Sequence, residues 1–76
     1  MRIRYSILRQ LVAVQTAIAE LKIDLEEHEA TYTGLDKDLV ANLTRCKIAL
    51  KEWDERELRT RLAAVDELTK KSRTEE

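Results

Sequence analysis

The chain has one glycine and no proline in 76 residues, so almost nothing in its sequence interrupts a helix. Turn-rich all-β folds need such residues at their connections, and their scarcity here excludes that class. Apolar residues recur at intervals of three and four along most of the chain, which is the spacing of one helix face. We therefore expect an all-α protein that forms a single domain over residues 1–76.

The first apolar pattern predicts a helix over about residues 6–32, with Ser6 as its N-cap. Its apolar residues alternate between the a and d positions of an unbroken heptad, and His28 and Tyr32 continue the series. These residues are expected to form the first half of a hairpin seam, the line of side chains between two paired helices: Ile7, Leu11, Val14, Ile18, Leu21 and Leu25.

The only glycine follows this pattern directly, inside a predicted turn over residues 33–36. Gly34 can adopt the left-handed conformation that ends a helix, with Leu35 packing back over the last turn. Asp36 can then cap a second helix, and a connection this short joins antiparallel neighbours. We predict a helical hairpin. The alternative is a single helix of about 65 residues that pairs in parallel, because glycine inside a helix costs only about 1 kcal/mol relative to alanine.

The second helix is predicted over about residues 37–70, followed by a frayed tail at 71–76. Intervals of four and three assign four residues to its half of the hairpin seam: Leu39, Leu43, Cys46 and Leu50. Trp53 continues this spacing, but Leu58 and Leu62 follow in another phase, which predicts a slip in the packing beyond Trp53. In a hairpin that turns at residues 33 and 34, this seam aligns the two helices so that His28 lies opposite Leu39.

One seam uses only part of the apolar surface that the two helices carry. A second set lies off the seam and, together with the large side chain of Trp53, is expected to contact another protein surface. The predicted interface residues are Leu8, Val12, Ala19, Ile23, Ile48 and Trp53. The simplest cover for them is a second hairpin, which would give an antiparallel four-helix bundle dimer or a higher oligomer.

The size of the chain also favours a partner. Domains of 8.9 kDa bury too little surface to be comfortably stable alone and usually need disulfides, a metal or partner subunits. One cysteine cannot form an internal disulfide, and one cysteine with one histidine is too few for a structural zinc site. We expect no cofactor and no metal, and we expect the chain to bind itself and another protein.

Charge is unevenly distributed although the net charge is only −1. Residues 20–38 contain seven carboxylates and two lysines, whereas residues 1–19 contain three arginines and no acid. The near-neutral total gives no general attraction to nucleic acid or to anionic membranes. A solvated helix surface explains this pattern, and a polarised rod whose acidic end meets a basic partner is the alternative.

No group of residues resembles a catalytic site. The chain has no nucleophile paired with a histidine, no glycine-rich phosphate loop and no metal cluster, so we expect no enzymatic activity. The leading hypothesis is a self-associating protein–protein interaction module, such as an adaptor, assembly factor, chaperone-like holder or inhibitor. The alternatives are a small nucleic-acid-binding regulator that uses the surface of a hairpin dimer, and a helical oligomer that sequesters a ligand.

The location of the protein is predicted from two absences. No apolar run reaches the roughly 18–20 residues that a membrane span needs, and no signal peptide is expected from the first residues. With a single thiol, the reducing cytoplasm is the expected compartment.

Overall fold

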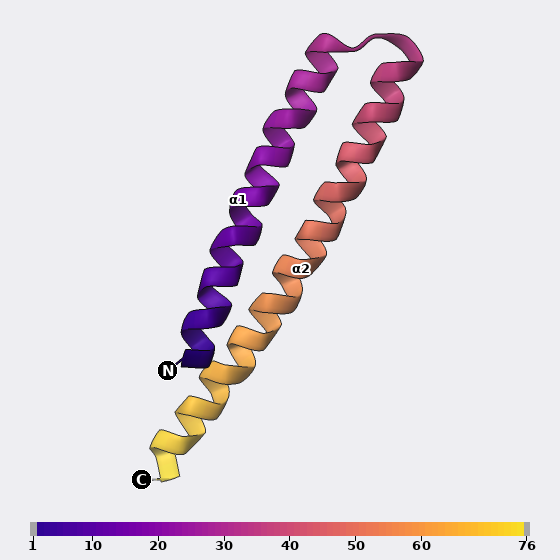
Figure 1. Ribbon diagram of the computed structural model, residues 1–76. Coiled ribbons are helices and arrows are strands. Elements are labelled where there is room, and N and C mark those ends of the chain that lie inside the picture. The colour runs from indigo at the N-terminus through magenta and orange to yellow at the C-terminus, as the bar shows by residue number, and fades with distance from the viewer. Residues whose placement is uncertain (1, 76) are drawn as a thin grey trace.

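The protein is a two-helix antiparallel hairpin (Figure 1). The computed structural model describes residues 2–75, with side chains for residues 2–71. Helix α1 (Arg2–Thr31) and helix α2 (Gly34–Glu75) lie side by side in a rod whose extents are 64 × 14 × 12 Å. No strand occurs among residues 2–75, which confirms the predicted all-α hairpin and contradicts the single continuous helix.

Both helices are longer than predicted. Helix α1 begins at Arg2, so Ser6 lies inside the helix instead of capping it, and its hydroxyl is 3.2 Å from Gln10 Nε2. The first turn of α1 is tied to α2 by an ion pair in which Arg4 Nε lies 2.8 Å from Asp66 Oδ1.

At the other end of the chain, α2 continues to Glu75, and the predicted frayed tail is therefore helical as far as that residue. The tail contains no glycine or proline, and four of its six residues are lysine, arginine or glutamate, which are good helix formers. The sequence prediction was wrong here because it required aliphatic residues for a helix to continue.

The chain reverses at Tyr32 and Thr33, the two residues between the helices. The N–H of Tyr32 donates to the carbonyl of His28 at 2.9 Å, and Gly34 then takes a φ of +64°. This is the left-handed conformation predicted for Gly34. Two details differ from prediction: α2 already begins at Gly34, ahead of Asp36, and Leu35 is 78% exposed and does not cover the end of α1.

The α1 half of the hairpin seam lies where the heptad predicted it. Ile7, Leu11 and Ile18 are buried, and three further members of the predicted seam are partly buried: Val14, Leu21 and Leu25. His28 is also partly buried, at the end of the seam nearest the turn. One face of α1 therefore packs on α2 along nearly its whole length.

The α2 half of the seam is not the predicted one. Leu39, Leu43 and Leu50 are 57%, 64% and 68% exposed, and Cys46 is exposed as well. The face that packs on α1 consists of residues that are buried or partly buried at the spacing of a heptad: Ala41, Thr44, Ile48, Lys51, Glu55, Leu58, Leu62, Val65 and Thr69. Ile48, which the sequence assigned to a partner interface, is only 8% exposed and lies in this seam.

The packing at the open end of the hairpin explains this choice of face. Ile7, Leu11 and Leu58 form the core cluster, and the partly buried side chains of Leu62 and Val65 pack against it. Since a helix is rigid, the orientation that turns Leu58 inward also turns inward the residues at heptad spacing before it. The spacing continues backward to Ala41 without interruption, so the predicted phase slip does not occur.

This orientation places polar residues in the seam. Thr44 is 5% exposed, and its hydroxyl donates to the carbonyl of Val40 at 3.0 Å and lies 3.3 Å from His28 Nδ1. His28 is thus opposite Thr44 and not Leu39, a shift of five residues along α2 from the predicted register. No buried side-chain nitrogen or oxygen among the described residues lacks a hydrogen-bond partner.

Candidate interaction surface

An apolar stripe on α2 is left without a partner in the hairpin. Its members are spaced by four, four, three, four and three residues, and we call them the outer stripe: Leu35, Leu39, Leu43, Cys46, Leu50 and Trp53. Each leucine of the outer stripe is more than half exposed, and so is Trp53 at 56%. Soluble monomers rarely expose apolar side chains in a continuous row of this kind, so the outer stripe is the strongest candidate for an interaction surface.

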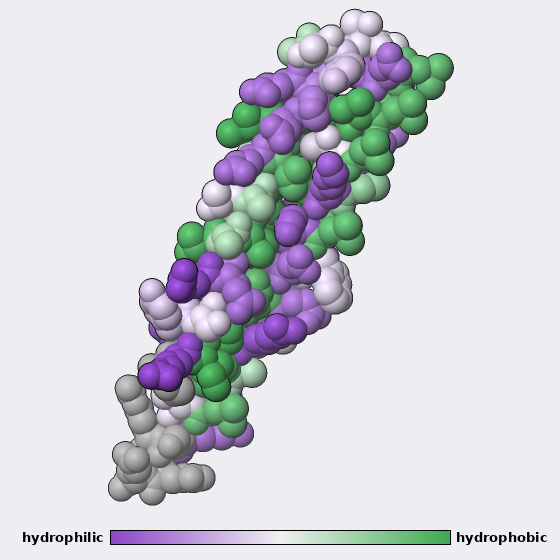
Figure 2. Space-filling view, viewed as in Figure 1, coloured by the Kyte–Doolittle hydropathy of each residue, from purple (hydrophilic) through white to green (hydrophobic). Residues whose placement is uncertain are grey.

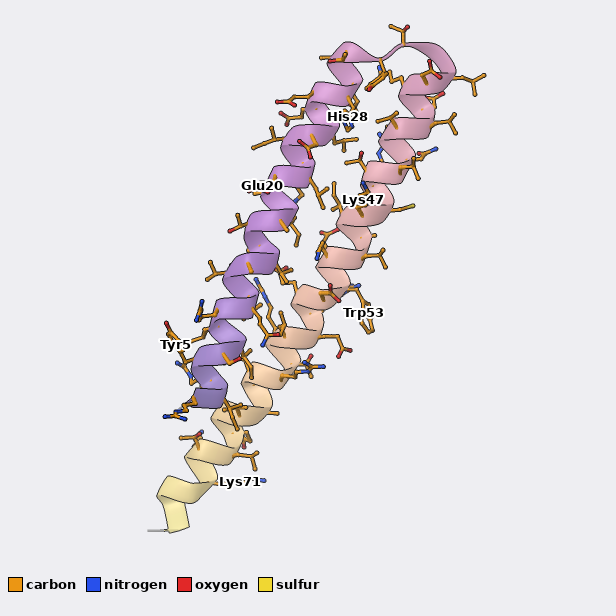
Figure 3. All side chains as sticks on the ribbon, viewed as in Figure 1. Tyr5, Glu20, His28, Lys47, Trp53 and Lys71 are labelled. Atoms are coloured by element: carbon orange, nitrogen blue, oxygen red, sulfur yellow. The ribbon has the colours of Figure 1, made fainter. Side chains whose placement is uncertain are left out.

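The outer stripe faces away from α1. In Figure 2, hydrophobic side chains follow the outer edge of α2 from the turn towards the middle of the rod. Figure 3 shows the side chain of Trp53, at the other end of the outer stripe, also directed away from α1. Because α1 and the leucines of the outer stripe lie on opposite sides of α2, α1 cannot cover these leucines without unfolding the hairpin.

The predicted interface residues on α1 form a weaker surface. Val12 and Ile23 are 62% and 54% exposed, and Ala19 between them is exposed, whereas Leu8 is partly buried. Val12 and Ile23 are separated by three turns of helix, so they do not form a continuous row. The outer stripe of α2 is therefore a larger exposed apolar surface than the surface predicted on α1.

A shallow groove lies beside Trp53. It is open to solvent, has a volume of about 310 Å³, and combines apolar side chains from both helices with charged residues of α2: Gln10, Ala13, Val14, Trp53, Asp54, Glu57, Leu58 and Arg61. Such a mixture of an aromatic anchor and charged rim residues is typical of protein contact surfaces. The groove extends the outer stripe towards the open end of the hairpin.

Three ion pairs form between described residues of the hairpin, and two of them involve basic residues of the middle of α2. Arg45 Nη2 lies 3.2 Å from Glu29 Oε1 across the helices, and Arg59 Nη2 lies 3.5 Å from Glu55 Oε2 one turn away on α2. These pairs engage two of the basic residues that a nucleic-acid-binding surface would use. The acidic segment over residues 20–38 occupies the turn end of the rod, and the three arginines of residues 1–19 lie towards the open end (Figure 1).

Two other kinds of site are absent from the described part of the chain. Among these residues no three His, Cys, Asp or Glu side chains gather closely enough to hold a metal ion. Neither helix, over the same residues, has a segment long and apolar enough to cross a lipid bilayer.

Comparison of this chain with known protein families, curated proteins and solved structures found no match.

Sequence reasoning found the members of the outer stripe but assigned most of them to the wrong surface. It missed Thr44, Lys51 and Glu55 in the hairpin seam, because polar residues at a and d positions do not stand out in a search for apolar spacing. One signal could have identified them: the heptad that contains Leu58, Leu62 and Val65 continues backward through these three residues to Ile48 and Ala41.

Proposed function

We propose that the protein is a non-enzymatic protein–protein interaction module whose docking surface is the outer stripe of α2. The observation that carries this proposal is the row of exposed apolar residues on the face of α2 opposite α1. Burying one such leucine in a partner surface contributes about 1.5–3 kcal/mol, so four leucines and a tryptophan suffice to drive association. A helix that presents residues at intervals of three and four is a common way to bind another helix or a groove.

The roles of adaptor, assembly factor, chaperone-like holder and inhibitor all use a surface of this kind. Self-association is part of the proposal, since a copy of the same hairpin can cover the outer stripe. We propose the cytoplasm as the compartment, on the basis of the unpaired and exposed thiol of Cys46.

Affinity capture from the source cell tests this function with two matched double variants. We expect Leu43→Ser with Leu50→Ser, both in the outer stripe, to abolish specific retention of protein by the hairpin. Val12→Ser with Ile23→Ser removes two apolar residues of similar exposure from α1 and is expected to retain the same proteins as the unaltered chain. Circular dichroism of each variant verifies that the helices persist, since all four replaced side chains are more than half exposed.

The result that contradicts the proposal is equal retention by the outer-stripe variant and the unaltered chain. If instead the α1 variant alone loses binding, the interaction surface is the one that the sequence predicted on α1, and our assignment to α2 is wrong.

A further inference from the structure

We infer that His28 and Thr44 are positioning residues for the outer stripe. A hydrogen bond from Nδ1–H of His28 to Oγ1 of Thr44 holds the turn half of α2 in the orientation that keeps the leucines of the outer stripe away from α1. The inference rests on the proposed function, because it states how the chain keeps that docking surface exposed. It follows from the protons of the two side chains, from their place in the hairpin seam, and from the alternative packing that they oppose.

The hydroxyl of Thr44 has a single proton, and that proton is already engaged. It is donated to the carbonyl of Val40 at 3.0 Å. Thr44 Oγ1 also lies 3.3 Å from His28 Nδ1, and a hydroxyl oxygen whose proton is engaged elsewhere can act there only as an acceptor. His28 therefore carries a proton on Nδ1, as a neutral imidazole does in one of its two tautomers.

Neighbouring contacts hold His28 in this position near the turn end of α1 (Figure 3). The ring of Tyr32 meets the imidazole edge to face, with the ring centroids 5.7 Å apart. One residue further along each helix, Arg45 Nη2 lies 3.2 Å from Glu29 Oε1. That ion pair is exposed and contributes little energy by itself, whereas Thr44 is 5% exposed. The hydrogen bond at Thr44 is therefore the main polar contact that fixes the register at the turn end.

This hydrogen bond lies far from the contacts that orient the other half of α2. Thr44 is separated from Leu58 of the core cluster by about 21 Å of helix. Between these two residues the hairpin seam contains the partly buried side chains of Lys51 and Glu55, which offer less apolar contact than aliphatic residues. A second anchor near the turn therefore secures there the orientation that Leu58 sets at the open end.

The packing that the hydrogen bond opposes has the leucines of the outer stripe turned towards α1. It is reached by separating the two helices and repacking them, and it places His28 opposite Leu39, as the heptad spacing of the outer stripe predicts. A leucine side chain offers no hydrogen-bond acceptor, so the imidazole would lose water without gaining a protein partner. Apolar residues at positions 28 and 44 remove this cost and should let the leucines turn inward.

Two residues of the outer stripe report which face of α2 is exposed. Cys46 is the only cysteine of the chain and Trp53 its only tryptophan, and both are exposed. In a variant with His28→Leu and Thr44→Val, we expect the rate of Cys46 alkylation to fall at least about threefold, because most molecules adopt the alternative packing. Quenching of Trp53 fluorescence by acrylamide should decrease in the same variant.

Two conservative variants serve as controls. Thr44→Ser retains the hydroxyl, and His28→Asn retains a donor, because the amide nitrogen of asparagine lies at about the same distance from the backbone as Nδ1. Both variants should keep the Cys46 alkylation rate of the unaltered chain. Circular dichroism verifies that the helices persist. The rates are compared at concentrations where further dilution does not change them, so that association through the outer stripe does not protect Cys46.

Nuclear magnetic resonance of the imidazole nitrogens tests the hydrogen bond itself. At about pH 9, where histidine side chains are neutral, we expect the proton of His28 on Nδ1 in the unaltered chain and in the Thr44→Ser variant. In the Thr44→Val variant the acceptor is lost, and we expect a mixture of both tautomers.

Two results would overturn the inference: a proton mainly on Nε2 of His28 in the unaltered chain, or equal alkylation rates of Cys46 in the unaltered chain and the folded double variant. Should the double variant unfold, Thr44→Val alone takes its place, with a smaller fall in rate expected and an unchanged rate contradicting the inference. Neither result contradicts the proposed function. Only equal protein capture by the variant with Leu43→Ser and Leu50→Ser does so, and the two failures are therefore distinguishable.

Discussion

Gly34 is the residue at which the chain turns from α1 into α2, and its φ of +64° is the only positive value among the described residues. A Cβ atom added at this position would meet no atom within 4 Å apart from its chain neighbours and the adjacent backbone of its own helix. The space around Gly34 therefore accepts a side chain, and the requirement for glycine comes from the backbone conformation alone.

Gly34→Ala is expected to lower the free energy of unfolding by about 1–2 kcal/mol, because an L-residue other than glycine is strained in the left-handed region. Urea unfolding at a fixed protein concentration measures this change. Gly34→Asn is the control, since asparagine tolerates this conformation better than alanine and should cost less. Equal losses for the two variants would mean that backbone strain is not the cause.

Leu58 is the residue of α2 at the centre of the core cluster, with 6% of its surface exposed. Leu58→Ala is expected to lower the free energy of unfolding by about 2–5 kcal/mol, because it leaves a cavity beside Ile7 and Leu11. Leu68→Ala makes the same chemical change on the same helix at a site that is 67% exposed, and should alter stability by less than about 0.5 kcal/mol. Similar losses for the two variants would contradict the packing of Leu58 against Ile7 and Leu11.

Helix α2 carries two competing apolar faces, and the one that packs on α1 is the more polar. Lys51 and Glu55 are partly buried in the hairpin seam, and 22% of the Glu55 side chain is exposed. Polar residues at such positions reduce the stability of a helix pair and restrict the registers that it can adopt. The outer stripe retains the leucines and therefore remains available for another surface.

Lys51→Leu tests which face of α2 packs on α1. If Lys51 lies in the hairpin seam, the leucine adds apolar contact with α1 and raises the free energy of unfolding by about 1 kcal/mol. Lys22→Leu introduces the same change at an exposed position of α1 and should have an effect below about 0.5 kcal/mol. Thermal unfolding followed by circular dichroism compares the two. A packing in which Leu50 and Trp53 faced α1 would predict no gain from Lys51→Leu.

The protein is a thin rod with a small core. Only six apolar side chains are buried among the described residues, and none of the side chains is fully enclosed. Two helices in contact along one face cannot enclose more than this, so covering the outer stripe would add substantially to the stability of the fold. The stability of the unaltered chain should accordingly rise with its concentration.

The shape of a single hairpin is measurable on the variant with Leu43→Ser and Leu50→Ser, which is expected to be monomeric. Small-angle X-ray scattering should give a maximum dimension close to the 64 Å of the rod. A continuous helix of the same length would extend to about 110 Å, at about 1.5 Å per residue. A value near this larger length would contradict the hairpin.

The sequence alone determined the two helices, the break at Gly34 and the face of α1 that is buried, because each depends on local signals. Glycine is unique in the chain, and Ile7, Leu11 and Ile18 belong to a single apolar pattern that has no competitor of similar strength on α1.

Only the tertiary structure decided which face of α2 packs on α1. The spacing of Leu39, Leu43 and Leu50 is as regular as that of the face that is buried, so local periodicity favoured the more apolar of the two. The choice depends on contacts between residues about 50 apart in sequence, where Leu58 meets Ile7 and Leu11. A rigid helix can pack only one of its faces on a neighbouring helix. The contacts of Leu58 therefore turn Thr44, Ile48 and Lys51 towards α1 and leave the outer stripe exposed.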